Sequence, residues 1–239
     1  MQPPTICSTL RCLHAKAGRT TNNQKGRLML TIHHLRLSQS ERIVWLAEEL
    51  GLEYDLKLYN RRADNRLAPD EYKALHPMGI APVITDDDLV LGESGAIIDY
   101  IVAKYAPDTA LVPGADHPGF ADHLFYYHWA NATFMTNGMM ALVAQFMGAK
   151  ELPAFVADRV AKGWAIVEKR LGEAEYFGGS QLTTADIMMG FQLTTSRAMS
   201  GTSIDGMPNL QAYLKRIGAR PAYQAAMAKC EPGMPPKLD

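Results

Sequence analysis

Ser38 and Glu41 lie where a short predicted strand passes into a predicted helix. The first turn of a helix presents free N–H groups and a partial positive charge, and both stabilise an anion. A hydroxyl at this place can donate a hydrogen bond to a bound thiolate and favour that ionised form. The same two residues, three apart, also fit a capping box that would only start the helix. Both interpretations of Ser38 stay open.

A proline directly precedes a short predicted strand in the segment HPMGIAPVI of residues 76–84. Proline cannot donate to a strand ladder, so its position here needs an explanation. A cis bond between Ala81 and Pro82 would turn the chain sharply and leave the backbone of Ala81 free to pair with a ligand. The alternative is an ordinary trans-proline loop, which is the commoner form.

Glu93 and Ser94 come just before a third predicted helix. The N–H and hydroxyl of Ser94 suit a ligand carboxylate, since a helix N-terminus binds anions. Glu93 can accept a hydrogen bond from a ligand ammonium beside it. A carboxylate and an ammonium on one carbon form an amino-acid head group. The alternative is that Ser94 only caps its helix.

The periodicity of apolar residues places these three segments on one α/β domain. The first two strands are joined through a helix and should be parallel, whereas the last two are joined by a tight acidic turn and should be antiparallel. The predicted strands span residues 29–35, 54–58, 82–85 and 89–91, and the predicted helices span residues 38–50, 69–75 and 94–105.

The remainder of the chain predicts helices only. Residues 107–118 are rich in Pro, Gly and Asp and are typical of a linker. Helices are predicted in residues 120–147, from Pro153 onward, and in residues 183–199, 208–217 and 221–229. The expected organisation is a disordered extension at 1–28, an α/β domain at 29–106, a linker at 107–118 and an all-helical domain at 119–239.

Composition excludes several classes of function. The chain of 239 residues has a net charge of −1, so no global field attracts nucleic acid or an anionic membrane. No apolar run reaches the roughly 18 residues that cross a bilayer. The cysteines are Cys7, Cys12 and Cys230, without a CxxC pair, which favours a reducing cytoplasm over a disulfide framework. Residues 1–28 contain no acid; the alternative to an extension is a transit peptide.

Histidine spacing predicts no metal site. His33 and His34 are neighbours in a predicted strand and should point to opposite faces. His123 and His128 are separated by about 140° around a helix and do not converge.

Taken in order, the motifs resemble the glutathione transferase family, especially bacterial members with a serine-type active-site loop. The loop LSQSER at 37–42 is similar to that loop, and residues 76–84 are similar to the family segment Asn-Pro-x-Gly-Lys-Val-Pro-x-Leu. Residues 93–101 resemble the signature Glu-Ser-x-Ala-Ile-x-x-Tyr-Ile. The run LTTADI at 182–187 resembles the family's N-capping box, and RPAY at 220–223 is also family-like.

The resemblance implies a thioredoxin-like α/β domain followed by an all-helical domain, and an enzyme that uses glutathione as co-substrate. The glutathione thiolate would attack a small, mostly apolar electrophile in a homodimeric, cytoplasmic detoxification enzyme without a metal. The implied roles are catalysis for Ser38; glutathione binding for Gln39, Ala81, Pro82, Glu93 and Ser94; and a border of the electrophile pocket for Tyr126 and Asn131.

One departure from the family pattern concerns the cation that would hold the glycyl carboxylate. The family's lysine is Ile80 here, so this contact is either missing or supplied from the region of Arg61, Arg62 and Arg66. No cysteine lies near Ser38, which disfavours a mixed disulfide between the protein and glutathione. Two alternatives stay open: a glutathione-dependent peroxidase or isomerase on the same fold, and a non-catalytic binding protein.

Overall fold

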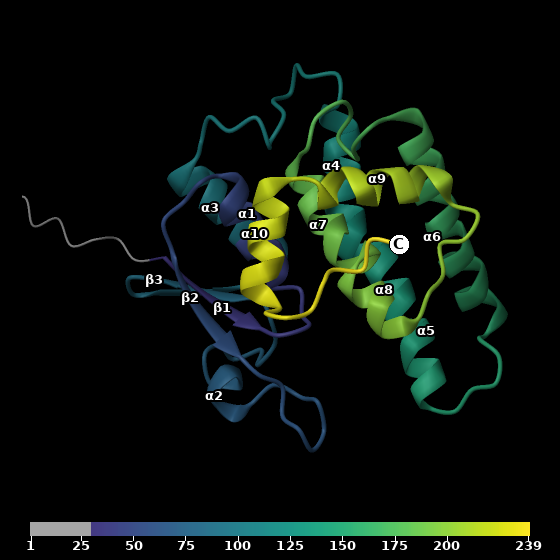
Figure 1. The fold of residues 1–239 in the computed structure, drawn as a ribbon, viewed down its shortest axis with the longest axis horizontal. Helices are drawn as coiled ribbons and strands as arrows, with labels where there is room; N and C mark the ends of the chain where they lie inside the picture. Colours follow the sequence, from purple (N-terminus) through teal and green to yellow (C-terminus); the bar gives the residue numbers. More distant parts are fainter. Residues whose placement is uncertain (1–29) are drawn as a thin grey trace, which may run out of the picture.

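The computed structural model describes residues 30–239, and the extension predicted at residues 1–28 lies outside this part (Figure 1). A four-stranded sheet in the order β2-β1-β3-β4 forms the first half. β1 pairs in parallel with β2, and β3 pairs antiparallel with both β1 and β4, which confirms both predicted strand directions. The elements are β1 (Thr31–Leu35), α1 (Glu41–Glu49), β2 (Asp55–Tyr59), α2 (Asp70–Lys73), β3 (Val83–Asp86), β4 (Leu89–Gly92) and α3 (Ser94–Tyr105).

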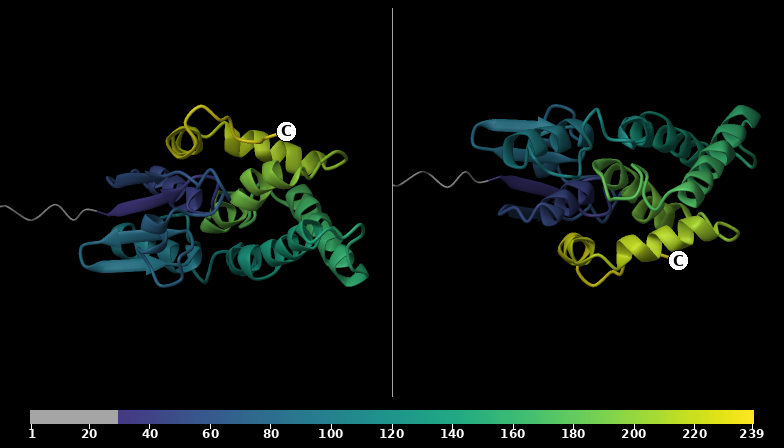
Figure 2. Two further views of the ribbon diagram at one scale, coloured as in Figure 1. Left: turned by 90° about the horizontal axis from the view of Figure 1, so that it is seen from below. Right: turned by 90° about the horizontal axis from the view of Figure 1, so that it is seen from above.

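Helices make up the second half. Figure 2 shows most of them on one side of the sheet, whereas the last helix, in yellow, lies beside α1 of the sheet half. They are α4 (Phe120–Trp129), the π-helix η1 (Ala130–Met135), α5 (Thr136–Phe146), α6 (Ala154–Glu173), α7 (Thr184–Leu193), α8 (Thr195–Ser200), α9 (Pro208–Gly218) and α10 (Pro221–Cys230). The fold class expected from the sequence is confirmed, and the domain boundaries at residues 29–106 and 119–239 stay a proposal. None of the helices within residues 30–239 combines the length and apolarity that a membrane span needs.

Two helices differ from their predictions. The predicted helix at 120–147 contains a π-helical turn, η1, between α4 and α5. The predicted helix at 183–199 breaks at Thr194, whose backbone leaves the helical region with φ −121° and ψ −89°. The Thr194 hydroxyl donates to the carbonyl oxygen of Gly190 at 2.9 Å, a contact by which threonine competes with regular helix hydrogen bonding.

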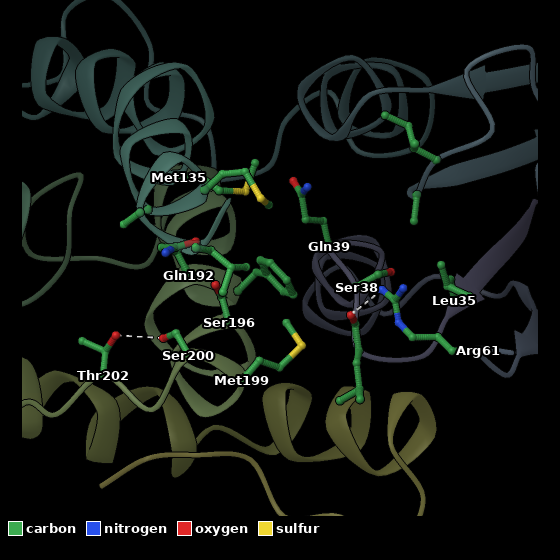
Figure 3. Close-up of a pocket in the computed structure, with 18 of the residues that line it drawn as sticks. Leu35, Ser38, Gln39, Arg61, Met135, Gln192, Ser196, Met199, Ser200 and Thr202 are labelled. Carbon is green, nitrogen blue, oxygen red and sulfur yellow. Dashed lines mark hydrogen bonds between the residues drawn. The ribbon is translucent and has the colours of Figure 1, made fainter. Parts of the chain in front are cut away.

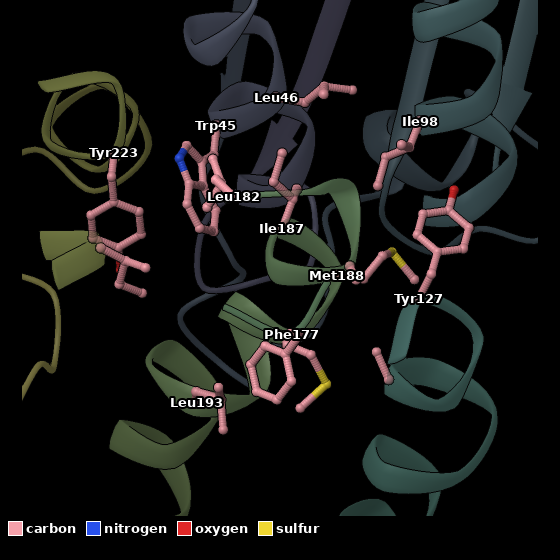
Figure 4. Packing of buried hydrophobic residues seen from close by; sticks show 14 of the residues in the cluster. Trp45, Leu46, Ile98, Tyr127, Phe177, Leu182, Ile187, Met188, Leu193 and Tyr223 are labelled. Atoms are coloured by element: carbon pink, nitrogen blue, oxygen red, sulfur yellow. The ribbon is translucent and has the colours of Figure 1, made fainter. Parts of the chain in front are cut away.

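One continuous apolar core joins the two halves of the molecule. Trp45 of α1 packs edge-on against Tyr223 of α10, with ring centroids 4.9 Å apart, and Ile187 of α7 lies beside it (Figure 4). A Cβ atom on Gly190 would lie 2.8 Å from the Trp45 ring, so α7 approaches α1 closely only because this residue is glycine. This packing fixes the position of the helices relative to the sheet.

A capping box begins α7, as the sequence predicts. The carboxylate of Asp186 accepts a hydrogen bond from the Thr183 N–H at 2.8 Å, and the Thr183 side chain accepts one from the Asp186 N–H. Asp186 also accepts hydrogen bonds from the Phe177 N–H and the Tyr213 hydroxyl, which ties two further segments to the start of α7.

Candidate functional site

Two adjoining hollows lie where the sheet meets the helices. The first, which we call the interdomain cavity, has a volume of about 570 Å³. In Figure 3, Ser38 and Arg61 form one wall of it, and Gln192 and Met199 face them from the helical half. The second, which we call the α3 pocket, has a volume of about 660 Å³ and lies at the N-terminus of α3. Gln39 lines both hollows, so they are connected through the serine loop.

Ser38 does not cap α1. The helix begins at Glu41 with Ser40 as its N-cap, and the Ser38 hydroxyl lies 2.7 Å from the Ser40 hydroxyl and 3.3 Å from the Ser40 N–H. The Glu41 carboxylate turns the other way and accepts a hydrogen bond from Thr195 at 2.7 Å. The capping-box interpretation of Ser38 and Glu41 is therefore wrong, because the tertiary partner on α8 takes the carboxylate. Ser38 is 6% exposed and borders the interdomain cavity.

Leu37, the residue before Ser38, is held in the left-handed region with φ 55°. This conformation costs a non-glycine residue roughly 1–2 kcal/mol, so the surrounding contacts must maintain it. The Leu37 N–H donates to Glu231 at 2.5 Å, and Arg61 donates to the Leu37 carbonyl oxygen at 2.8 Å. The backbone that positions Ser38 is thus clamped from both sides.

Glu93 and Ser94 line the α3 pocket at the start of α3. Glu93 is exposed and, with φ 72°, is one of four non-glycine residues with positive φ within residues 30–239. Strain of this kind clusters at binding sites. Ser94 is buried and is the first residue of α3, not its N-cap, so the interpretation of Ser94 as a cap is wrong. Its hydroxyl accepts a hydrogen bond from Arg42 at 3.3 Å. The Ala81–Pro82 bond is cis, which decides between the two alternatives left open by the sequence.

Arg42 lies fully buried beside the α3 pocket, and its importance was missed from the sequence. Its Nη1 atom donates to Gln39 at 2.6 Å, to Asn131 at 2.8 Å and to Ser94. Its Nε and Nη2 atoms are buried without a hydrogen-bond partner in the part of the chain that the structure describes. Burial lowers the pKa of Arg42 to about 10, so it remains a cation at neutral pH. The signal in the sequence that could have identified it is an arginine among the apolar residues of the helix α1.

The predicted site residues are divided between the two hollows and the apolar core. Asn131, predicted at the electrophile pocket, lies in the α3 pocket instead. Tyr126 lines neither hollow; it is 8% exposed and packs on Phe177 with ring centroids 5.1 Å apart. The residues predicted to bind glutathione all line the α3 pocket: Gln39, Ala81, Pro82, Glu93 and Ser94.

The helical wall of the interdomain cavity was not predicted. It consists mainly of apolar side chains with a few polar groups among them. Which face of each helix looks inward depends on how five segments pack together, and helical periodicity alone does not reveal it. This wall includes Met135, Met139, Leu142, Trp164, Phe191, Gln192, Ser196 and Met199.

The two adjacent histidines of β1 have separate partners. His33 lies within hydrogen-bond distance of the Tyr59 hydroxyl and Thr85, whereas His34 contacts Ser40 and Glu231. Within residues 30–239, no group of three or more His, Cys, Asp or Glu side chains is arranged to hold a metal ion.

The buried carboxyl of Glu41 predicts a pH-dependent stability. Burial raises its pKa to about 8, against the hydrogen bond from Thr195 and the charge of Arg42, which lower it. Between about pH 4.5 and 8 the folded protein keeps a proton that the unfolded chain has released, so the free energy of unfolding falls as pH rises. Glu41→Gln should flatten this fall by several kcal/mol, as measured by urea denaturation at pH 5, 7 and 8.

The matched control is Glu151→Gln, because Glu151 is exposed. This variant should retain the slope of the wild type. An equally steep fall in Glu41→Gln would show that another group causes it.

Comparisons with known proteins agree with this geometry. Residues 38–104 match the family model of the glutathione S-transferase N-terminal domain, and residues 130–221 match that of the C-terminal domain. Glutathione S-transferase 3 of Schizosaccharomyces pombe is 28% identical over 219 residues, covering 85% of this chain and 88% of that protein. The crystal structure of a glutathione S-transferase from Actinobacillus pleuropneumoniae is 35% identical, with a TM-score of 0.75, covering 85% of this chain and 93% of that one.

Proposed function

Because the chain belongs to the glutathione S-transferase family, we propose that the α3 pocket binds glutathione and that Ser38 stabilises its thiolate for attack on an electrophilic carbon. The observation that carries the proposal is the meeting of Glu93, Ser94 and Ala81 in one pocket that adjoins Ser38 through Gln39. Ala81 is distant in sequence from the adjacent pair Glu93 and Ser94. The pair suits the γ-glutamyl end of the tripeptide, and Ala81 suits its cysteinyl part.

The γ-glutamyl end of glutathione occupies the N-terminus of α3 in this proposal. Its carboxylate binds the N–H and hydroxyl of Ser94, where the helix terminus and the buried charge of Arg42 both attract an anion. Its ammonium binds Glu93, which is exposed in the same pocket. The cysteinyl backbone pairs with the main chain of Ala81, and the thiol then faces Ser38.

The glycyl carboxylate requires a cation to replace the family's lysine at Ile80. Arg61 and Lys73 both line the interdomain cavity close to Ala81, and we assign the role to them. Arg62 is engaged with Asp64 in an ion pair of 2.8 Å at the surface and does not line either hollow.

The interdomain cavity holds the electrophile in this proposal. Its apolar helical wall includes several methionines, which adapt to ligands of different shape. Such a wall suits a small, mostly apolar electrophile, as expected for a detoxification enzyme. Following the family resemblance, we also propose a homodimer in the cytoplasm.

Conjugation of glutathione to a generic aryl halide tests the proposal directly. The wild-type protein should bind immobilised glutathione and turn over the aryl halide. Glu93→Gln should weaken binding by about tenfold or more, since a hydrogen bond to a charged group is worth about 1.5–3 kcal/mol. The control Glu71→Gln, at an exposed carboxylate away from both hollows, should behave as the wild type.

The two alternatives give different results in the same assays. Retention on immobilised glutathione without turnover of a broad panel of electrophiles would indicate a binding protein. Faster reduction of an organic hydroperoxide than conjugation of any electrophile would indicate a peroxidase.

A further inference from the structure

A chain of buried side chains runs from Ser38 into the protein interior. The Ser38 hydroxyl lies 2.7 Å from that of Ser40, which lies 2.8 Å from Nδ1 of His34. The other ring nitrogen of His34, Nε2, lies 3.4 Å from the carboxylate of Glu231. His34 and Ser40 are 0% exposed and Glu231 is 3% exposed, so Ser38 is the end that borders the cavity. Glu231 follows α10, which packs beside α1 (Figures 1 and 2).

Glu231 is held as a carboxylate. Burial alone would raise its pKa, but hydrogen bonds from His34, the Leu37 N–H and Arg36 keep the pKa below its ordinary value. Arg36 donates to it from Nε at 2.9 Å. A carboxylate only accepts hydrogen bonds, so the tautomer of His34 that fits this contact carries its proton on Nε2 and leaves Nδ1 as an acceptor.

The remaining hydrogen bonds then have one direction. The Ser40 hydroxyl lies 2.8 Å from Nδ1 of His34 and 3.4 Å from the Leu35 carbonyl oxygen, so its proton goes to the nearer acceptor, Nδ1. The Leu35 N–H donates to the Ser40 oxygen at 3.2 Å. The Ser40 oxygen in turn accepts the proton of Ser38. The Ser38 oxygen also accepts the Ser40 N–H at 3.3 Å, so one lone pair remains at the cavity wall, which is the arrangement of a proton acceptor.

We propose that the two serines form a relay that carries the thiol proton of bound glutathione to His34, an inference that rests on the proposed function. The S–H bond breaks as the Ser38 oxygen takes the proton. Ser38 passes its original proton to Ser40, and Ser40 passes its own to Nδ1 of His34. The products are a thiolate, two neutral serines with reversed hydroxyls, and an imidazolium beside the Glu231 carboxylate; no atom is oxidised or reduced.

The reversed hydroxyls explain why the relay favours ionisation. After the transfer, the Ser38 O–H points toward the sulfur and donates a charge-assisted hydrogen bond to the thiolate. Glu231 positions His34 and balances the imidazolium. After the product leaves, the same relay returns the proton to water in the open cavity.

The other ionisable groups around His34 do not compete for this role. Glu41 faces Thr195 of α8, and burial raises its pKa to about 8. Burial also raises the pKa of the Cys230 thiol well above its ordinary value. Arg36 and Arg61 are cations that contact Glu231 and the loop backbone rather than the ring. Glu231 is the carboxylate in contact with His34.

The decisive measurement counts protons released per thiolate when glutathione binds at about pH 7.5. The thiolate is measured by ultraviolet absorbance and proton release by calorimetry in buffers of different ionisation enthalpy. The wild type should release far fewer than one proton per thiolate because His34 retains them. His34→Asn and Ser40→Ala should each release about one, and the acid limb of the kcat/KM profile should move up by about one pH unit.

Two further variants separate the relay from a structural role. His33→Asn changes the neighbouring histidine of the same strand and should keep the wild-type proton count and pH profile. Glu231→Gln can still accept a hydrogen bond from the Leu37 N–H but has no charge to hold the imidazolium, so its proton count should also rise toward one per thiolate. If His34→Asn fails to fold, Ser40→Ala and Glu231→Gln decide the question.

Failure of the relay and failure of the proposed function look different. A wild type that neither binds glutathione nor forms the thiolate would contradict the proposed function. A wild type that forms the thiolate but releases one proton for each, with His34→Asn unchanged, would overturn the relay and leave the proposed function intact.

Discussion

Ser38→Ala is expected to reduce kcat/KM for glutathione conjugation by about 10- to 100-fold. The expectation follows from the loss of one hydrogen bond to a charged group, worth about 1.5–3 kcal/mol, at a tenfold rate change per 1.36 kcal/mol. Without the hydroxyl, the thiol of bound glutathione should stay protonated at neutral pH. The KM for the electrophile should change little, since the helical wall of the interdomain cavity is untouched.

Titration of the thiolate absorbance in the Ser38→Ala complex is the direct check. The pKa of bound glutathione should rise relative to that of the wild-type complex. The free energy of unfolding should fall by only about 1 kcal/mol, because Ser38 does not cap α1 and loses only its contacts to Ser40. Ser196→Ala is the matched control, as this serine lines the same cavity from α8. An identical thiolate titration in the Ser38→Ala variant and the wild type would remove Ser38 from the mechanism.

The sheet half of the site was predictable from the sequence because its signals are local. A proline before a strand, an acidic residue and a serine before a helix, and the strand–helix alternation each act within a few residues. The cis Ala81–Pro82 bond and the shared pocket of Glu93 and Ser94 agree with those signals.

The contacts that complete the site span the chain and could not be predicted in the same way. His34 was considered from sequence only as a metal ligand, whereas its partner Glu231 lies 197 positions away and reaches it because α10 packs on α1. Arg42 likewise meets Asn131 across 89 positions. Such pairs depend on the docking of the two halves, which is set by the Trp45 and Gly190 contact rather than by any motif near the serine loop.

A local motif can also mislead when a distant partner competes for the same group. Ser38 and Glu41 have the spacing of a capping box, yet Thr195 takes the Glu41 carboxylate. Thr183 and Asp186 have the same spacing and do form the box. The difference is that Asp186 faces the start of its own helix, whereas Glu41 faces α8.

Asp186→Ala is expected to destabilise the fold by at least about 3 kcal/mol, because it leaves several buried hydrogen-bond donors without an acceptor. The carboxylate accepts the N–H groups of Phe177 at 2.9 Å and Thr183 at 2.8 Å, together with the hydroxyls of Thr183 and Tyr213. Thr183→Ala removes one cap only and should cost about 1 kcal/mol. Urea denaturation of both variants, with the exposed Asp205→Ala as control, measures the difference.

The consequence of Asp186→Ala for activity follows from the position of α7. This helix places Gln192 in the interdomain cavity and holds Gly190 against Trp45 of α1, so loosening its first turn disturbs both the electrophile wall and the docking of the two halves. Folded Asp186→Ala protein should therefore lose affinity for the electrophile more than for glutathione, whose proposed pocket lies at α3. Equal free energies of unfolding for Asp186→Ala and Thr183→Ala would mean that the additional acceptor contacts of the carboxylate contribute nothing, and that water satisfies the stranded donors.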